Sequence, residues 1–167
     1  MSTLFLFLFA LIALTFSAFF SGMEIAFVSS SKLKIELDNK KGQFSAKILS
    51  FFSSKPAWFI AAMLIGNNIA LVIYTLHVAE LIEPYLISIN LNSSVILLIQ
   101  TLFSTFFILL FAEFLPKAIF RLNPNYTLKF FSFILIVFYI LLWPITVLVV
   151  FLSNSILKIF GNEESID

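Results

Sequence analysis

The sequence predicts an all-α integral membrane protein, with three transmembrane helices joined by shorter helical elements on the cytoplasmic side. Of the 167 residues, 61% are hydrophobic and only 11% are charged, whereas soluble domains usually carry about 25% charged residues. The mean hydropathy is +1.09, and the apolar residues gather in runs long enough to cross a bilayer. Most lysines cluster between these runs, which is typical of cytoplasmic loops.

The composition also excludes several classes of function. The chain has no cysteine and one histidine, which rules out disulfide frameworks and cysteine catalysis and argues against a zinc centre. With four glycines there is no glycine-rich phosphate loop, and no basic aromatic patch points to a nucleic-acid partner. The glutamates in the apolar stretches have no nucleophile or catalytic metal set beside them, so we expect no enzymatic activity.

The first span is predicted at residues 4–28, long enough to cross a hydrocarbon core of about 30 Å. No basic residue precedes it and no small-residue cleavage site follows it, so we expect a retained helix and not a signal peptide. The lysine-rich segment that follows is expected to be cytoplasmic, which puts the N-terminus outside. Its lysines are Lys32, Lys34, Lys40, Lys41, Lys47 and Lys55.

This lysine-rich segment is expected to form two short amphipathic helices that lie against the inner leaflet. Leu33 and Leu37 recur at helical spacing before a turn at residues 39–42. A second apolar set follows at the same spacing, and lysines alternate with both sets, as in interfacial helices. The residues of the second set are Phe44, Ile48, Leu49 and Phe52.

Two further spans follow. The second is predicted at residues 57–78, opened by Pro56 and Trp58, and the third at residues 95–119. The connection at residues 77–94 carries two glutamates but no lysine or arginine, which fits the outer side. Basic residues then return the chain to the cytoplasm, and these are Lys117, Arg121 and Lys129.

The last apolar stretch, residues 126–160, is too long for one span and too short for two. Pro144 divides it, and because proline breaks or kinks a helix, we favour a juxtamembrane helical hairpin bent at Pro144. Cationic residues at both ends, Lys129 and Lys158, also favour a hairpin with both ends in the cytoplasm. The alternative is a fourth span.

The first span carries polar groups on one face. Ser17, Ser21 and Glu24 are separated by four and three residues, which places them on the same side of a helix. An ionisable group costs about 3 kcal/mol or more in hydrocarbon, so this face is a candidate functional site. Glu24 also has a structural alternative, because it lies near the inner end and can pair with Lys32 or Lys34.

The other two spans place polar groups at the same depth. The second has Asn67 and Asn68 directly after Gly66, and the third has Glu113. Counted from the cytoplasmic ends at about 1.5 Å per residue, Ser21, Asn67 and Glu113 lie roughly 10 to 16 Å deep. This convergence predicts one site between three helices.

Pro116 adds a backbone oxygen to the predicted site. A proline within a helix removes the hydrogen bond to the carbonyl four residues earlier, here that of Ala112. Hydroxyl, amide, carboxylate and carbonyl oxygens together suit Mg²⁺, Ca²⁺ or Na⁺ better than softer metals. The alternative is structural: serine and asparagine often hydrogen-bond between membrane helices, and Glu113 can pair with Lys117 four residues later.

Three short motifs occur in order along the chain. F-S-G-M-E-I-A occupies residues 20–26, I-G-N-N residues 65–68 and A-E-F-L-P-K residues 112–117. They resemble F-S-G-x-E-x-A, I-G-N-[NT] and G-E-x-x-P-K of the cyclin M/CorC (CNNM/CorC) family of magnesium transporters, with alanine in place of one glycine. The resemblance covers essentially the whole chain. Two positions depart from the family's usual residues: Met23 stands where the family often has Ser or Thr, and Leu71 stands where it often has Asn.

The resemblance implies a homodimer of three-span protomers that exports Mg²⁺ across the cell membrane, coupled to Na⁺ influx. Glu24 would serve the coupling ion or the structure, and Lys117 would be a pairing partner near the inner gate. Leu71 in place of asparagine bears on the Na⁺ coupling. The Mg²⁺ ligands implied by the motifs are Ser17, Ser21, Asn67 or Asn68, and Glu113.

The resemblance also implies a domain organisation. Family members usually continue into paired cytosolic CBS domains, so we expect a membrane domain at residues 1–160 and the start of a linker at residues 161–167. The expected partners are membrane lipids and a second copy of the chain. The alternative function is a non-transporting membrane anchor or sensor with a structural or signalling cation site.

Overall fold

The computed structural model describes residues 2–159, in which every regular element is a helix. The all-helical class predicted from the sequence is therefore confirmed. Residues 161–167, predicted to begin a linker, lie outside the described part of the chain. The elements are α1 Thr3–Ser29, α2 Lys32–Lys40, α3 Phe44–Ser54, α4 Pro56–Ser88, α5 Ser93–Phe107, η1 Ile108–Phe114, α6 Leu115–Phe120 and α7 Pro124–Ile159.

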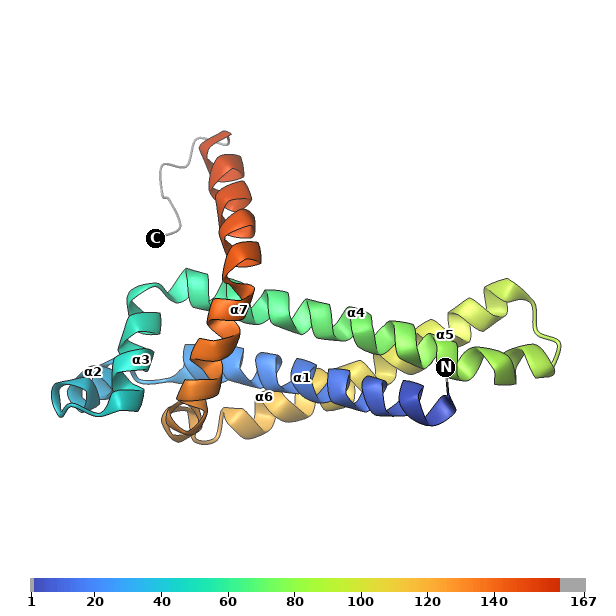
Figure 1. Ribbon diagram of the computed structural model, residues 1–167, viewed down its shortest axis with the longest axis horizontal. Coiled ribbons are helices and arrows are strands. Elements are labelled where there is room, and N and C mark those ends of the chain that lie inside the picture. The colour runs from blue at the N-terminus through green and yellow to red at the C-terminus, as the bar shows by residue number, and fades with distance from the viewer. Residues whose placement is uncertain (1, 160–167) are drawn as a thin grey trace.

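Three helical units, which we call the long-axis helices, run along the length of the molecule (Figure 1). They are α1, α4 and the continuous run of α5, η1 and α6, and α1 packs against α4, η1 and α6. Each is long and apolar enough to cross a membrane. The bounds predicted for the first and third spans agree with α1 and with Ser93–Phe120 to within two residues.

The second predicted span, residues 57–78, is too short. α4 continues to Ser88, so most of the connection predicted at residues 77–94 is helical and only residues 89–92 link α4 to α5. Hydropathy marks where the apolar run ends, whereas the backbone hydrogen bonds continue past it. The helix also passes through Pro84, because an internal proline removes one hydrogen bond without necessarily ending a helix.

The connection at residues 89–92 is short because two asparagines shape it. Asn90 has a φ of 56°, in the left-handed region that asparagine adopts more readily than most residues. The side-chain oxygen of Asn92 then accepts a hydrogen bond from the N–H of Val95 at 2.9 Å and caps the start of α5. The long-axis helices α4 and α5 are therefore joined by a tight turn.

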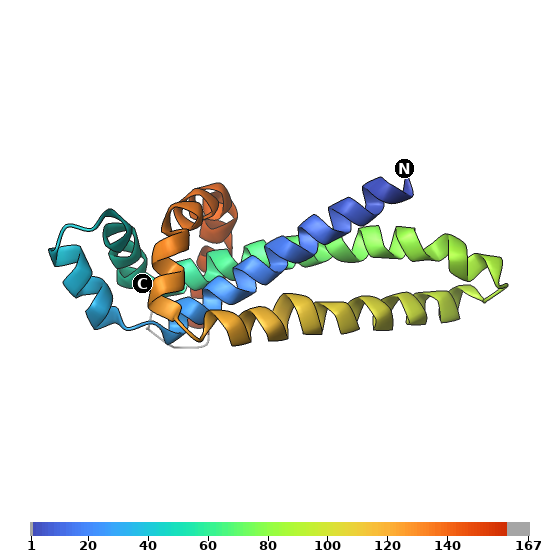
Figure 2. The ribbon, with the colours of Figure 1, turned by 90° about the horizontal axis from the view of Figure 1, so that it is seen from below.

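The hairpin predicted at residues 126–160 is wrong. α7 is one continuous helix that passes through Pro144. Neighbouring groups and small local adjustments can compensate for the hydrogen bond that a proline removes from an apolar helix. By length and composition, Pro124–Ile156 is a fourth candidate span, so a count of three is not confirmed. Figures 1 and 2 show α7 crossing the long-axis helices instead of running beside them.

The predicted pair of short helices is present as α2 and α3, joined at Gly42 with a φ of +78°. α2 buries Ile35 against the core, while Leu33 and Leu37 on its other side are exposed. These two leucines are therefore free to contact a bilayer surface, as the sequence pattern predicted. α3 instead turns its apolar face inward, and its buried residues include Ile48, Leu49 and Phe52.

α2, α3 and α7 gather at one end of the long-axis helices, and we call them the belt helices (Figure 2). Trp58 at the start of α4 stacks on Trp143 of α7, with ring centroids 5.1 Å apart. The Lys129 ammonium of α7 donates a 2.8 Å hydrogen bond to the Asp38 carboxylate of α2. The aromatic stack thus connects α7 to α4, and the ion pair connects α7 to α2.

The Asp38–Lys129 pair predicts a pH-dependent contribution to stability. The hydrogen bond from Lys129 holds the pKa of the Asp38 carboxyl below its ordinary value. A lowered folded-state pKa stabilises the fold above the unfolded-state pKa of about 3.9, and this stabilisation disappears as pH falls through the folded-state value. Asp38→Asn should therefore lower the thermal unfolding temperature in detergent modestly at pH 7.

The same comparison repeated in acid provides the check. Wild type and Asp38→Asn should approach one unfolding temperature as the pH falls below about 4. A difference between them that stays constant from pH 7 to pH 3 would contradict the role assigned to this ion pair.

Candidate cation site

Ser17 and Ser21 of α1 face the protein interior and not the lipid. Their exposed fractions are 0% and 1%, and both lie on the side of α1 that is covered by its neighbours. The two serines of the predicted face thus point inward, whereas Glu24, its third member, is half-buried. Polar hydroxyls are costly inside an apolar protein unless they are hydrogen-bonded, so the partner of each serine is informative.

Ser17 has a partner on the second long-axis helix. Its hydroxyl donates a 2.5 Å hydrogen bond to the side-chain oxygen of Asn67, which is 7% exposed. Asn68, one residue later, is exposed, because successive residues of a helix point about 100° apart. Of the two asparagines that the sequence left open, Asn67 is the one directed at α1.

Ser21 lies one turn farther along α1, and its Oγ is buried without a hydrogen-bond partner. Leaving a buried hydroxyl unpaired costs about 1–3 kcal/mol, and native proteins keep few such groups. A hydroxyl held in this way next to a Ser17–Asn67 pair is available to a ligand that the protein itself does not supply.

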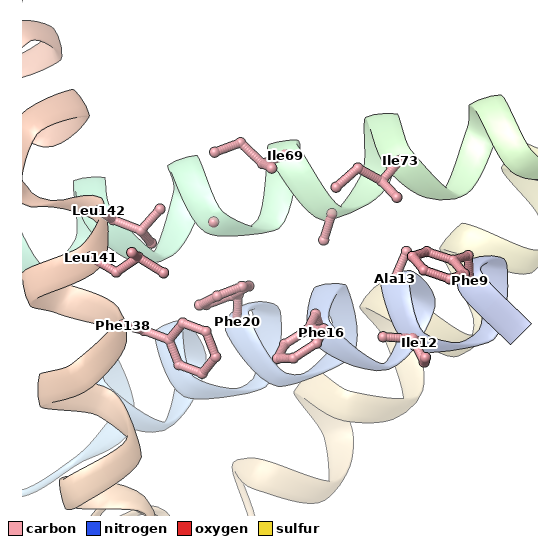
Figure 3. Close-up of a pocket in the computed structure, with 12 residues that line it drawn as sticks. Phe9, Ile12, Ala13, Phe16, Phe20, Ile69, Ile73, Phe138, Leu141 and Leu142 are labelled. Atoms are coloured by element: carbon pink, nitrogen blue, oxygen red, sulfur yellow. The ribbon is translucent and has the colours of Figure 1, made fainter.

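Two glycines allow the helices to approach closely beside these serines. A Cβ added at Gly66 of α4 would lie 2.8 Å from the ring of Phe20, and one added at Gly22 of α1 would lie 2.8 Å from the ring of Phe120. Figure 3 shows the Phe20 ring between α1 and α4, beside Phe138 of α7. Gly66 is therefore a packing residue of the site, and not a ligand.

The third long-axis helix contains a π-helical segment, η1, that the sequence reading missed. The N–H of Leu115 bonds to the carbonyl of Leu110, five residues earlier. In this register the carbonyl opposite Pro116 is that of Phe111 and not that of the predicted Ala112. Pro116, two residues after the end of η1, was the available signal, because a residue without an N–H disturbs the α register.

Glu113 lies within η1 and pairs with Lys117 of α6, whose Nζ is 3.2 Å from Oε2 of Glu113. The two side chains are 33% and 41% exposed. They line a cavity of about 640 Å³ together with Arg121, which the sequence had marked only as a topology signal. Glu24 of α1 interacts electrostatically with both Glu113 and Lys117. The predicted ion pair is present, and Glu24 belongs to the same charged group.

The cavity lined by Glu113, Lys117 and Arg121, which we call the charged cavity, differs in its lining from the neighbouring hollow. A second hollow of about 290 Å³ lies between α1, α4 and α7, and its lining is apolar, including Phe16, Phe20 and Phe138 (Figure 3). An ion would find no oxygen ligand from a charged side chain there. The hollow that contains Glu113, Lys117 and Arg121 is the one that suits a charged solute.

The structure thus gives two polar groups around α1. Ser17 and Asn67 are hydrogen-bonded with Ser21 one turn away, and Glu24, Glu113 and Lys117 form the charged group. Within residues 2–159, no three histidine, cysteine, aspartate or glutamate residues come together. A cation bound here would therefore need hydroxyl and amide oxygens as well as a carboxylate, which is the chemistry of Mg²⁺, Ca²⁺ and Na⁺.

Comparison with known proteins identifies the family. The model of the cyclin M transmembrane N-terminal domain (CNNM) matches residues 8–167. The chain belongs to the cyclin M family. The family assignment predicted from the three sequence motifs is therefore confirmed.

Bacterial relatives of this cyclin M domain are UPF0053 proteins, of the CorC/CNNM family. A protein of Mycoplasma genitalium is 33% identical over 77% of the chain and 28% of its own length. An inner membrane protein of Escherichia coli is 29% identical over 87% of the chain and 32% of its own length. A protein of Haemophilus influenzae is 27% identical over 96% of the chain and 36% of its own length. The chain thus spans about a third of the length of the relatives it matches.

The two asparagines of this cyclin M domain provide a matched pair of variants. Asn67→Ala leaves the buried Ser17 hydroxyl without its acceptor and should destabilise the protein by about 1–2 kcal/mol. Asn68→Ala removes an exposed side chain and should stay within about 0.5 kcal/mol of wild type. Chemical unfolding in mixed micelles measures both. Equal losses would contradict the assignment of Asn67 to the inner face.

The contact between Gly66 and Phe20 predicts a rescue. Gly66→Ala brings a methyl group against the Phe20 ring and should cost about 1–3 kcal/mol. Adding Phe20→Leu removes the ring, so the double variant should lose less stability than the sum of the two single variants. Thermal unfolding of wild type, the two single variants and the double variant measures this coupling. Losses that simply add would show that Gly66 and Phe20 do not restrict each other's size.

Proposed function

We propose that this chain is the membrane part of a magnesium transporter that exports Mg²⁺ in exchange for Na⁺ influx. The observation that carries the proposal is the buried Ser21 hydroxyl without a partner, one turn from the Ser17–Asn67 hydrogen bond. The proposed Mg²⁺ ligands are Ser17, Ser21, Asn67 and Glu113. Membership of the cyclin M family supports a cation as the solute.

The chemistry of Mg²⁺ fits this ligand set. Mg²⁺ is held by oxygen ligands at 2.0–2.1 Å and loses its water reluctantly. A membrane site for it therefore needs neutral oxygens that replace water and a carboxylate that offsets the charge. The two serine hydroxyls and the Asn67 amide oxygen supply the first, and Glu113 supplies the second.

The proposed route begins at the charged cavity. The cavity lined by Glu113, Lys117 and Arg121 would admit Mg²⁺ from the belt end of the molecule. Toward the other end, the hollows between the helices are lined mainly by apolar residues such as Phe7, Phe103 and Leu81, which would exclude ions. Export would then require the long-axis helices to change their packing, so that the site opens on the opposite side. Glu24, beside Glu113, is the proposed residue for Na⁺ or for holding the charged group together.

The proposed setting is the cell membrane, with the N-terminus outside and the belt helices on the cytoplasmic side. Lysines concentrated in α2, α3 and the residues around them support this orientation. We propose that two copies assemble as a homodimer, that α7 lies along the inner surface, and that cytosolic CBS-type domains complete the protein. No catalytic residue is assigned, and transport without chemical conversion is the proposed activity.

The alternative is a membrane anchor or sensor, in which the cation only stabilises or signals. The share of the relatives' length that this chain covers, about a third, is the observation that favours it, because other parts of such proteins can hold the activity. Binding of Mg²⁺ without any flux would support this alternative.

Ser21→Ala separates function from stability. Because the Ser21 hydroxyl has no protein partner, removing it should cost no stability, yet it should weaken Mg²⁺ binding at least about tenfold. Calorimetry on purified protein measures the binding, and proteoliposomes with opposing Mg²⁺ and Na⁺ gradients measure the flux. Glu113→Gln should abolish both.

Ser53→Ala is the matched control, since Ser53 of α3 also has a buried hydroxyl without a partner, but in the belt helices. It should leave binding and flux unchanged. Unaltered Mg²⁺ flux in both Ser21→Ala and Glu113→Gln would overturn the proposed site.

A further inference from the structure

The charged group at the cavity contains its own cation. Lys117 is the sole lysine or arginine within the long-axis helices α1, α4 and the α5–η1–α6 run. Its ammonium is bonded to Oε2 of Glu113 at 3.2 Å, so it lies on the carboxylate that the proposed function gives to Mg²⁺. Lysine and the transported ion therefore compete for the same oxygen atoms.

The charges show why both cannot stay. Lys117 and Arg121 are the two cationic side chains that line this cavity, and Glu113 is its one carboxylate. A divalent cation added beside both would place three cationic groups around one carboxylate. Withdrawal of the Lys117 ammonium as the cation binds reduces this excess of positive charge, which is costly inside a membrane domain.

The distances lead to the same conclusion. A Mg²⁺ ion about 2.1 Å from a Glu113 oxygen would lie within roughly 5 Å of the ammonium in its present position. Even at the dielectric constant of water, repulsion between a divalent and a monovalent cation at that distance changes a binding constant about tenfold. In a partly buried cavity the effect is larger.

Lys117 is also placed so that it can leave. Its side chain is 41% exposed, it borders the cavity, and α6 ends three residues later at Phe120. A lysine near the end of a membrane helix can extend its flexible stem and carry the ammonium to the water interface. Glu113 lies farther from the end of the helix, within the π-helical segment η1, and its side chain is less exposed, at 33%.

We propose that Lys117 is a resident counter-cation, which occupies the Glu113 carboxylate in the absence of Mg²⁺ and lowers the affinity of the site. Ion binding is then an exchange, in which Mg²⁺ displaces the ammonium and the returning ammonium promotes release. Lys117 thus determines affinity without being a ligand. This inference rests on the proposed function, because it assumes that Mg²⁺ binds at Glu113.

The test compares variants of Lys117 in the full chain by calorimetric titration with MgCl₂ in detergent. Lys117→Met keeps the length and apolar stem of the side chain but removes its charge, and it should bind Mg²⁺ about tenfold more tightly or better. Lys117→Arg keeps the charge and should bind close to wild type. Lys117→Gln serves as a second neutral variant if the methionine protein does not fold, as judged by gel filtration and thermal unfolding.

Lys129→Met is the matched control, because Lys129 forms a similar ion pair with Asp38 in the belt helices. It should leave Mg²⁺ affinity unchanged. Equal or weaker binding by the neutral Lys117 variants would overturn the inference, since a lysine that merely positions Glu113 would weaken binding when removed. If wild type and all variants fail to bind Mg²⁺, the proposed function itself falls.

Discussion

The structure depends on the requirement that a polar group in an apolar environment find a partner within the protein. Most backbone groups of residues 2–159 satisfy this requirement by forming helices. Polar side chains find a partner in three ways: Ser17 bonds to Asn67, Glu113 pairs with Lys117, and exposed threonines such as Thr15 bond to the backbone of their own helix. The buried hydroxyl of Ser21 has no such partner. Of the two buried hydroxyls without a partner, those of Ser21 and Ser53, only that of Ser21 lies within the long-axis helices.

The site and the fold are therefore connected through α1. This helix contacts α4, η1, α6 and α7, so each proposed ligand outside α1 comes from an element that α1 touches. The helices approach closely where a phenylalanine ring of one lies against a glycine of the other. Gly22 and Gly66, next to Ser21 and Asn67, are the two glycines at these contacts. The belt helices then hold the far end of the bundle through the Trp58–Trp143 stack. A change in any of these contacts alters the geometry of the same few oxygens.

Much of this arrangement follows from sequence, and the exceptions have physical causes. Apolar runs predict α1 and Ser93–Phe120 closely, because hydrophobic length is what a bilayer selects. The same signal fails for α4 beyond the apolar run and for α7 at Pro144, where hydrogen bonding continues regardless of hydropathy. The choice between Asn67 and Asn68, and the π register before Pro116, depend on neighbouring helices that a single sequence does not specify.

The two phenyl rings seated on glycines also have a mechanical consequence. Aliphatic side chains between helices can change rotamer and let the gap shrink or widen, whereas a flat aromatic ring lying on a bare glycine backbone acts as an incompressible spacer. Phe20 on Gly66 and Phe120 on Gly22 thus hold α1 at a set distance from α4 on one side and from α6 on the other. Thermal fluctuations change that spacing little, so these two ring contacts set how far α1 can move against α4 and α6 beside Ser21.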